Sequence, residues 1–240
     1  MRELRHVGFT PQADLDIVQD IDLDIGEGQC VVITGPNGGG KTTLAKLIAG
    51  IERPTSGQIL LRGEDITRLS VTERARRGIG YAFQQPVRFQ GMTVRELMEI
   101  AAGEALEEAR LCNMLSRVGL CAKDYIDRQV NASLSGGEIK RIEIATVLAR
   151  HSQLCIFDEP EAGIDLWSFR SLIEVFTRLR ERRERSLIII SHQERILSIA
   201  DEIVVVAEGR VIQRGPRQAV LPTLLAEKQG CDFCPKEASV

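Results

Sequence analysis

The chain has 240 residues, of which 43% are hydrophobic and 27% are charged, and its formal net charge is −3. This composition predicts a globular protein with a substantial core, and the negative balance argues against a nucleic-acid binder held by bulk charge. The apolar runs are too short to cross a bilayer, the N-terminus has no signal-peptide core, and the cysteines suggest no disulfide framework. We therefore expect one domain over residues 1–240, in the reducing cytoplasm and without a nucleic-acid partner.

Short segments in the first 62 residues predict an antiparallel sheet. Residues 20–25 read Asp-Ile-Asp-Leu-Asp-Ile, which is the period-two pattern of a strand with one wet face and one buried face. Residues 4–9 and 58–62 are expected to pair with it. The resulting small sheet would flank the glycine-rich stretch that lies between them in the chain.

This glycine-rich stretch follows a predicted buried strand at 30–33 and precedes a helix closed by Gly50. Glycines let backbone N–H groups point at phosphate oxygens, and the helix N-terminus adds a positive dipole. A lysine supplies a cation for the outer phosphates, and the next hydroxyl can ligate Mg²⁺. A turn that merely caps a helix would not need all these features. We therefore predict a phosphate-binding loop formed by Gly35, Pro36, Asn37, Gly38, Gly39, Gly40, Lys41, Thr42 and Thr43.

The pattern changes from strands to helices after residue 85. Residues 79–83 predict a strand that delivers Gln84 to its C-terminal end. From about residue 86 to residue 150 the strand patterns stop, and apolar residues recur with helical spacing. This region is expected to be a helical insertion in an α/β core.

Residues 134–138, Leu-Ser-Gly-Gly-Glu, open the last long helix of the insertion. Ser135 and Glu138 have capping-box spacing, so one interpretation is a simple helix start. Two consecutive glycines in a first turn cost about 1 kcal/mol each relative to alanine, however, and a helix that needs only a cap would avoid them. Glycines here allow another group to approach, and the helix N–H groups form an anion site. The chain is thus predicted to carry two anion sites far apart in sequence.

Three further buried strands are predicted at 154–157, 187–190 and 203–206, followed by a hairpin turn at Glu208-Gly209 and a helix around 217–229. The first of these strands ends in two acids. At a strand's C-terminal end beside a phosphate loop, Asp158 is placed to hold Mg²⁺, and Glu159 is placed to polarise the attacking water as general base. Ordinary surface acids are the alternative, which the upstream phosphate loop weakens.

The order of these motifs resembles that of ABC-type ATPases. Gln84 matches the Q-loop glutamine, Asp165 in Ala-Gly-Ile-Asp (162–165) matches the D-loop, and His192 matches the switch histidine. The resemblance extends from about residue 2 to residue 215. It implies an α/β P-loop NTPase fold of the ABC type, with a mostly parallel core sheet flanked by helices, an antiparallel β subdomain and an inserted helical subdomain.

The same resemblance implies an ATPase that forms an ATP-dependent, head-to-tail homodimer around two ATP molecules with Mg²⁺. Each ATP would lie between the phosphate loop of one copy and the signature of the other, formed by Ser135, Gly136 and Gly137. The implied catalytic residues are Lys41, Gln84, Glu159 and His192. The implied Mg²⁺ ligands are Thr42, Gln84 and Asp158.

Adenine recognition is where the sequence departs from this family. Family members often stack adenine on an aromatic residue about two dozen residues before the phosphate loop, where this chain has Pro11 and Gln12. Phe9 is the nearest aromatic residue, and its alternation fits a core position equally well.

Within the family, several motifs are similar to those of SufC, the ATPase of iron–sulfur cluster assembly. Residues 136–144 read Gly-Gly-Glu-Ile-Lys-Arg-Ile-Glu-Ile, which is similar to Gly-Gly-Glu-Lys-Lys-Arg-Asn-Glu-Ile in SufC, whereas transporter ATPases commonly have Gly-Gly-Gln-Gln-Gln-Arg. Residues 82–87 and 191–197 also resemble SufC segments, and the chain has no evident regulatory domain. This resemblance implies a soluble SufB-like scaffold as partner.

The alternative is the nucleotide-binding subunit of a membrane transporter, with transmembrane ABC subunits as partner. Both interpretations share the same nucleotide chemistry. In either case residues 85–92 are expected to line the docking groove. The expected contacts there are Pro86, Val87 and Phe89, with Phe89 as anchor.

Two groups of residues lie outside these motifs. Cys231 and Cys234, in a tail at 230–240, supply only two of the four ligands of a closed metal site, so two exposed thiols and a metal-binding or sulfur-relaying pair both stand as interpretations. Residues 178–185 are rich in arginine and predict a solvated helix end. A nucleic-acid contact there is the weaker interpretation, because no aromatic residues are interleaved.

Overall fold

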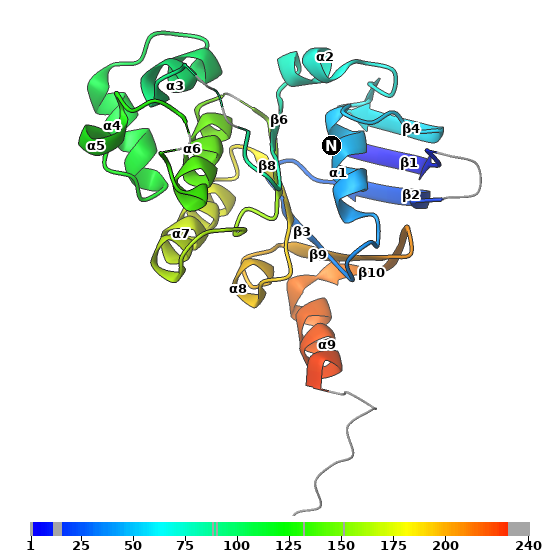
Figure 1. Ribbon diagram of the computed structural model, residues 1–240. Helices are drawn as coiled ribbons and strands as arrows, with labels where there is room; N and C mark the ends of the chain where they lie inside the picture. The colour runs from blue at the N-terminus through cyan, green and yellow to red at the C-terminus, as the bar shows by residue number, and fades with distance from the viewer. Residues whose placement is uncertain are drawn as a thin grey trace, which may run out of the picture.

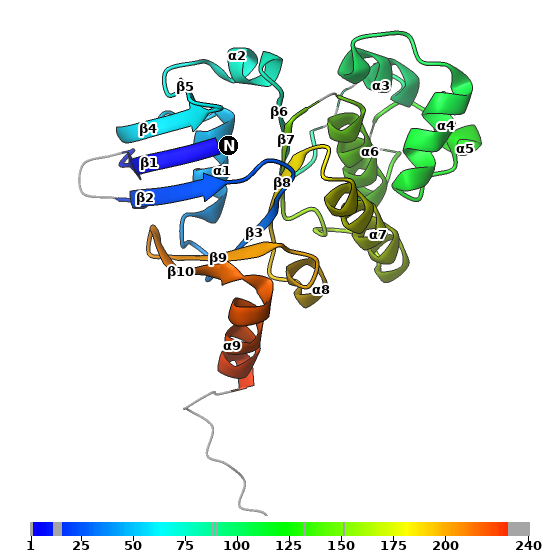
Figure 2. The same ribbon diagram turned by 180° about the vertical axis from the view of Figure 1, so that it is seen from behind.

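Two β-sheets organise the chain (Figures 1 and 2). The computed structural model describes residues 2–11, 16–87, 89, 91–131, 133–150 and 152–229. A four-stranded antiparallel sheet has the order β2-β1-β4-β5, and a six-stranded sheet has the order β10-β9-β3-β8-β7-β6. The strands of the first sheet are β1 (Arg2–Phe9), β2 (Val18–Ile25), β4 (Ser56–Leu61) and β5 (Glu64–Asp65). Those of the second are β3 (Cys30–Thr34), β6 (Ile79–Ala82), β7 (Leu154–Asp158), β8 (Ser186–Ile190), β9 (Glu202–Ala207) and β10 (Arg210–Pro216).

Neighbouring strands of the larger sheet are parallel except at its edge, where β10 runs antiparallel to β9. β3, β7 and β8 are buried along their whole length, as expected for continuous apolar strands covered on both faces. In β2, Ile21 and Leu23 are buried while Asp20, Asp22 and Asp24 are exposed. The predicted mostly parallel core sheet and the flanking antiparallel sheet are therefore both confirmed.

The helices cover the larger sheet on both faces. α1 (Lys41–Ala49) packs between the two sheets, and α2 (Val71–Arg76) lies beside it. On the other face lie α6 (Gly136–Ala149) and α7 (Leu166–Arg182). α3 (Val94–Ala102), α4 (Glu108–Arg117) and α5 (Ala122–Tyr125) stand beyond them, on the side away from the smaller sheet (Figure 1). The predicted helical insertion is thus confirmed.

Two separate apolar cores result from the alternation of side chains along the sheet. Val31 and Ile33 pack with α1 and the smaller sheet, whereas Cys30 and Val32 pack with the helices of the other face. Burial raises the pKa of the Cys30 thiol to about 12. This thiol therefore serves as a small apolar core group.

Small differences from the predicted elements have local causes. β6 ends at Ala82 rather than residue 83, because the Phe83 N–H donates to Glu143 Oε1 at 2.9 Å instead of to a strand. The predicted hairpin turn is present, with φ of 49° at Glu208 and 74° at Gly209.

The predicted final helix is present as α9 (Arg217–Gln229), which comes after β10. A short helix that the sequence analysis did not predict, α8 (Glu194–Leu197), comes before β9. The predicted tail at 230–240, with Cys231 and Cys234, lies outside the described residues, as does Gln12. In the part of the chain that the structure describes, no helix has the length and apolar character that a membrane crossing needs.

Candidate active site

The phosphate loop joins the C-terminal end of β3 to the start of α1. Gly35 has a φ of 130° and Gly40 a φ of 100°, which residues with a Cβ rarely adopt. A Cβ on Gly35 would lie 2.1 Å from the Val206 carbonyl oxygen of β9, so packing also requires glycine there. No side chain caps α1. Its first N–H groups therefore remain available to an anion, as the phosphate-binding prediction requires.

Lys41 folds back over the loop that carries it. The residue is only 6% exposed, and its Nζ donates to the carbonyl oxygens of Gly35 and Pro36, both at 2.8 Å. Burial lowers the pKa of the amine, and the carboxylates of Glu159 and Asp158 oppose this shift. A buried ammonium group beside the loop N–H groups is suited to bind phosphate oxygens.

Thr42 and Asp158, far apart in sequence, are hydrogen-bonded. The Thr42 hydroxyl donates to Asp158 Oδ1 at 3.1 Å, and the Tyr81 hydroxyl donates to Asp158 Oδ2 at 2.9 Å. Asp158 is 1% exposed, and this burial raises the pKa of its carboxyl group. A hydroxyl beside an oriented, buried carboxylate offers the oxygen ligands that Mg²⁺ prefers. The residues present therefore fit the expected metal.

Gln84 and Glu159 form a second pair next to the loop. Gln84 Nε2 donates to Glu159 Oε2 at 2.8 Å. Glu159 has a φ of 45°, an uncommon conformation for a non-glycine residue, and its N–H donates to the Ile190 carbonyl at 3.0 Å. Both side chains line a cavity of about 510 Å³ together with Ile17 and residues 37–43. The loop, the Q-loop glutamine and the predicted general base thus meet at one cavity.

His192 follows β8 and lies beside the beginning of the phosphate loop. It lines a neighbouring cavity whose other lining residues are Thr34, Gly35, Pro36, Asn37, Leu197, Leu224 and Leu225. The preceding residue, Ser191, donates from its hydroxyl to Glu161 Oε1 at 2.5 Å, which anchors this part of the chain. The structure therefore brings His192 to the loop, but not to the cavity that Glu159 lines.

Ser135 lies at the start of α6 and forms the predicted capping box. Its side chain accepts from the Glu138 N–H at 3.2 Å, and its own N–H donates to Glu138 Oε2 at 2.6 Å. The Tyr125 hydroxyl donates to the other oxygen of Glu138. These contacts, that from Tyr125 above all, lower the pKa of Glu138 to about 2. The capping box of the helix-start interpretation is therefore confirmed, and the anion site at this segment stays a prediction.

The two signature glycines have different surroundings. A Cβ on Gly137 would lie 2.9 Å from the Gly163 carbonyl oxygen of the predicted D-loop, whereas a Cβ on Gly136 would meet nothing within 4 Å. Gly137 therefore permits packing within the chain, while Gly136 presents open backbone. Among the described residues that line the phosphate-loop cavity, none comes from 135–137. The two predicted anion sites are separate within one chain.

Asp165 caps the N-terminus of α7. Its Oδ1 accepts from the N–H groups of Trp167 and Ser168, both at 3.0 Å, and its Oδ2 accepts from the Ser168 hydroxyl. These hydrogen bonds, led by that of Ser168, lower the pKa of Asp165. The residues that follow it are unusually open for apolar side chains: Leu166 is 66% exposed and Trp167 is 81% exposed.

Lys140 is a buried cation that the sequence prediction missed. Its side chain is fully buried, its Nζ donates to the carbonyl oxygens of Phe83 and Gln84, and it lies 3.4 Å from Glu143 Oε2. Through these contacts α6 holds the backbone that carries Gln84. A signal was available, because Lys140 and Glu143 stand three residues apart in the segment that resembles SufC.

Arg74 was also not identified from the sequence as a buried residue. Nothing in the sequence around it distinguishes it from the neighbouring arginines. It is completely buried, and its Nη1 donates to the carbonyl oxygens of Leu47 and Ile48 at 2.6 Å and 3.0 Å. These carbonyls lie in the last turn of α1, where a cation is favourable. Arg74 thus supports the helix that follows the phosphate loop.

Phe89 lines an apolar groove of about 390 Å³. The groove also receives side chains from α2, β6 and α3, among them the exposed Val71 and Ile100, and the exposed Phe83 that follows β6. Val87 and Pro86 lie earlier in the same loop and do not line the groove, although Val87 is 42% exposed. Of the three expected docking contacts, only Phe89 faces it. Phe9, the candidate adenine contact, is only partly exposed and packs against the core beside the smaller sheet.

Comparison with known proteins places the chain in a family. The sequence profile described as "ABC transporter" matches residues 18–162, which is more than half of the chain. The chain is 38% identical over 213 residues to an uncharacterized ABC transporter ATP-binding protein of Methanocaldococcus jannaschii, covering 85% of each. The chain therefore belongs to the ABC transporter family. It is an ABC ATPase domain.

Two relatives with named substrates are import proteins. The chain is 34% identical over 211 residues to the methionine import ATP-binding protein MetN 1 of Rhodococcus jostii, and 37% identical over 206 residues to the sulfate/thiosulfate import ATP-binding protein CysA of Thermosynechococcus vestitus. These matches cover 84% and 82% of this chain but only 61% and 59% of the relatives. The chain thus spans about three fifths of their length. Neither relative is a SufC protein, so they do not support the finer resemblance or its SufB-like partner.

Solved structures confirm the expected fold class. The cbiO1 protein of Clostridium perfringens, part of an ABC transporter complex, aligns with a TM-score of 0.77 and 27% identity over 95% of this chain and 93% of its own. The dimeric ATP-binding cassette MJ0796, in a post-hydrolysis state with ADP and Pi, aligns with a TM-score of 0.80 and 22% identity over 90% of this chain and 99% of its own. At that identity the second likeness shows the fold alone.

Proposed function

We propose that two copies of this chain close head to tail around two ATP molecules and drive a conformational change in a membrane-embedded partner. The observation that carries the dimer is the open signature face. The Gly136 backbone has no neighbour within 4 Å on its Cβ side, and Trp167 in the adjoining helix is 81% exposed. A second copy that brings its phosphate loop to this face would cover both and complete two nucleotide sites.

The residues around the phosphate loop have distinct proposed roles. Lys41, now bonded to loop carbonyls, turns its ammonium group to the outer phosphates when these occupy the loop. Thr42, Asp158 and Gln84 hold Mg²⁺, which when bound neutralises negative charge on the phosphates. The Thr42 hydroxyl and the Asp158 carboxylate already adjoin, which supports this assignment.

Glu159 is proposed to accept the proton of the attacking water. Its Oε2 currently accepts a hydrogen bond from Gln84, so Gln84 orients the carboxylate and couples it to the loop that precedes the helical insertion. His192 contacts the terminal phosphate from the other side of the phosphate loop. Ser135, Gly136 and Gly137 act from the second copy, and Asp165 holds the D-loop next to them through its cap on α7.

The apolar groove at Phe89 is the proposed docking site for the partner. Phe83, Phe89 and Ile100 leave apolar surface exposed there, and Lys140 ties the same loop to the signature helix. Motion of α6 on closure would therefore reach the groove. The named import relatives support transmembrane subunits of a transporter as the occupants.

Phe89→Ala tests the groove, with Ile212→Ala as matched control because Ile212 is 63% exposed on β10, outside the groove. We expect Phe89→Ala to keep ATP affinity within about twofold and to weaken the partner complex by tenfold or more, as for loss of an aromatic anchor. The Ile212→Ala protein should retain the complex. Equal retention by both variants would place the docking site elsewhere.

A soluble SufB-like scaffold is the second candidate partner, and the resemblance of residues 136–144 to SufC is what favours it. Within this segment Lys140 and Glu143 form a buried pair that fixes the loop before Gln84. Affinity purification of tagged protein from its native cell, without and with detergent, separates the candidates. A multi-span protein recovered only with detergent supports the transporter. A soluble scaffold recovered without detergent supports cluster assembly instead.

A further inference from the structure

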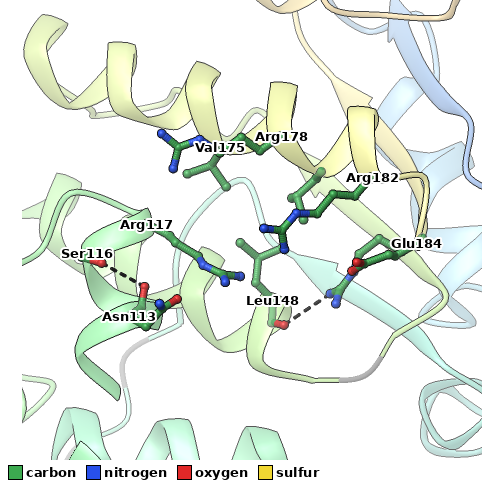
Figure 3. A pocket seen from close by; sticks show the side chains of 10 residues that line it. Asn113, Ser116, Arg117, Leu148, Val175, Arg178, Arg182 and Glu184 are labelled. Carbon is green, nitrogen blue, oxygen red and sulfur yellow. Dashed lines mark hydrogen bonds between the residues drawn. The ribbon is translucent and has the colours of Figure 1, made fainter. Parts of the chain in front are cut away.

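Four arginines line a pocket of about 300 Å³ between α4 of the helical insertion and α7 (Figure 3). Arg117 comes from the last turn of α4, Arg178 and Arg182 come from α7, and Arg185 comes from the segment that leads into β8. In Figure 3, Arg117 and Arg182 extend from the two helices into the space between them. The other lining residues are Asn113, Ser116, Leu148, Val175, Leu179 and Glu184.

Both arginines of α7 that lie outside the pocket have carboxylate partners. Arg170 lies 3.8 Å from Glu174, and Arg180 bonds Asp201 at 2.8 Å. In contrast, neither Arg117 nor Arg182 forms an ion pair within the described part of the chain, and Arg178 only approaches Glu174 at 3.8 Å. The basic run at 178–185 is largely exposed, as the sequence predicts for a solvated helix end, and three of its arginines also line this pocket.

Helix dipoles offset part of the positive charge of the four pocket arginines, but not all of it. Arg117 and Arg182 each lie in the last turn of a helix, where the dipole contributes about half a negative charge. These two ends, the C-terminal end of α6 beside Arg185, and Glu184 together offset about two and a half of the four positive charges. An excess of about one and a half positive charges remains in a space that a small molecule can enter, and an anion would relieve the repulsion between the guanidinium groups.

The pocket is remote from the nucleotide. Arg185 precedes β8, whose other end, five residues later, reaches the phosphate-loop side. A strand of that length spans about 16 Å. The Arg185 guanidinium also donates to the Leu148 carbonyl at 3.3 Å and to the Arg150 carbonyl at 3.5 Å. The floor of the pocket is thus the C-terminal end of α6, whose N-terminal end carries the signature.

We propose that this pocket binds a small phosphate-bearing anion held between Arg117 of the helical insertion and Arg178 and Arg182 of α7. The planar guanidinium groups suit the oxygens of a phosphate group and can bind them in pairs. The pocket holds a phosphate with a small substituent, and the chain offers no aromatic stacking side chain among the lining residues for a nucleic acid. The bound anion joins the insertion to α7 and contacts the far end of the signature helix.

The test uses Glu159→Gln saturated with Mg-ATP, so that the phosphate loop is occupied. Inorganic phosphate is titrated into this protein by calorimetry, with chloride at equal ionic strength as reference. The pocket variant adds Arg117→Ala and Arg182→Ala, two exposed side chains whose loss should not prevent folding. The matched control adds Arg170→Ala, because Arg170 is exposed on the same helix and does not line the pocket.

We expect phosphate to bind the parent and the Arg170→Ala control equally, and the double variant at least tenfold more weakly, because each lost charge-assisted hydrogen bond is worth about one decade or more in affinity. Glycerol phosphate in a parallel titration distinguishes the source. Tighter binding than inorganic phosphate assigns a phosphorylated small molecule, and weaker binding assigns free phosphate. Absence of binding to the parent, or equal affinity in the double variant, would overturn the proposal.

Discussion

The phosphate loop and the signature helix are both helix starts built for anions, yet they differ in how complete they are within one chain. At the phosphate loop, Lys41, Thr42 and Gln84 already contact the carbonyl and carboxylate groups that surround the nucleotide cavity. At the signature, Ser135 is used by its own capping box, and Gly136 faces open space. The phosphate loop is therefore preorganised, whereas the signature helix, at Gly136, has no partner group among the described residues of the same chain.

This difference separates binding from turnover. In our proposal a single chain can hold ATP, but hydrolysis requires the signature of a second copy. Variants on the phosphate-loop side should therefore lose affinity or chemistry in any assembly state. Variants on the signature side should lose dimer formation and turnover but should keep the ATP affinity of the single chain.

Glu159→Gln should reduce ATP turnover by about 10²–10⁴-fold, because a general base is removed while the cavity keeps its shape and its hydrogen bond to residue 84. ATP affinity should be retained. Turnover is measured by phosphate release, and affinity is measured separately by equilibrium nucleotide binding. Normal turnover in this variant would remove Glu159 as the base and would leave the phosphate-loop side without its catalytic group.

Lys41→Ala should weaken ATP binding by about 10- to 150-fold, since one or two charge-assisted hydrogen bonds to phosphate are lost. Calorimetric titration of the isolated chain measures this. Gly136→Arg is the matched comparison on the signature side and should leave the affinity of the single chain unchanged. If both variants lost affinity equally, the contrast between the two regions would be wrong.

Glu138→Gln should remove an acid-sensitive part of the folding stability. The Tyr125 hydrogen bond lowers the pKa of Glu138 to about 2 from an ordinary value of 4.5. A lowered acid pKa stabilises the folded state above pH 4.5, and this contribution is lost as the pH falls from 4.5 towards 2. The variant should cost at most about 3 kcal/mol at neutral pH and nothing near pH 2.

Urea unfolding at several pH values tests this, with Tyr125→Phe as a second variant that removes the main cause of the shift. The Tyr125→Phe protein should show a smaller slope of stability against pH between 4.5 and 2. A slope that is unchanged in both variants would mean that the capping box contributes nothing specific to the signature helix.

The sequence predicted well the parts of the site that depend on neighbouring residues. The turn at 35–40 follows from its glycines, and the placement of Asp158 and Glu159 follows from a short apolar strand that ends in acids. These are local consequences of backbone geometry and strand period. The ABC-type order of motifs then gave the fold, because that order is tied to one arrangement of strands.

Side-chain contacts between segments that are distant in the chain could not be predicted from the sequence. The Tyr81 hydroxyl reaches Asp158, and the Lys140 ammonium reaches the Phe83 carbonyl, only because β6, β7 and α6 pack side by side. Neither residue type nor local period marks such pairs. The basic run at the end of α7 is exposed, as the sequence predicts, but its position opposite Arg117 could not be predicted, because Arg117 lies some sixty residues earlier in the chain.

The most direct test of the account is the mass of Glu159→Gln in solution with saturating Mg-ATP, measured by sedimentation alongside the same protein carrying Gly136→Arg. We predict a dimer with one ATP per chain for the first protein and an ATP-bound monomer for the second. Trp167, the only tryptophan in the sequence, should change its fluorescence only in the first. A Glu159→Gln protein that stays monomeric with ATP bound, or a dimer that survives Gly136→Arg, would contradict completion of the site by a second signature.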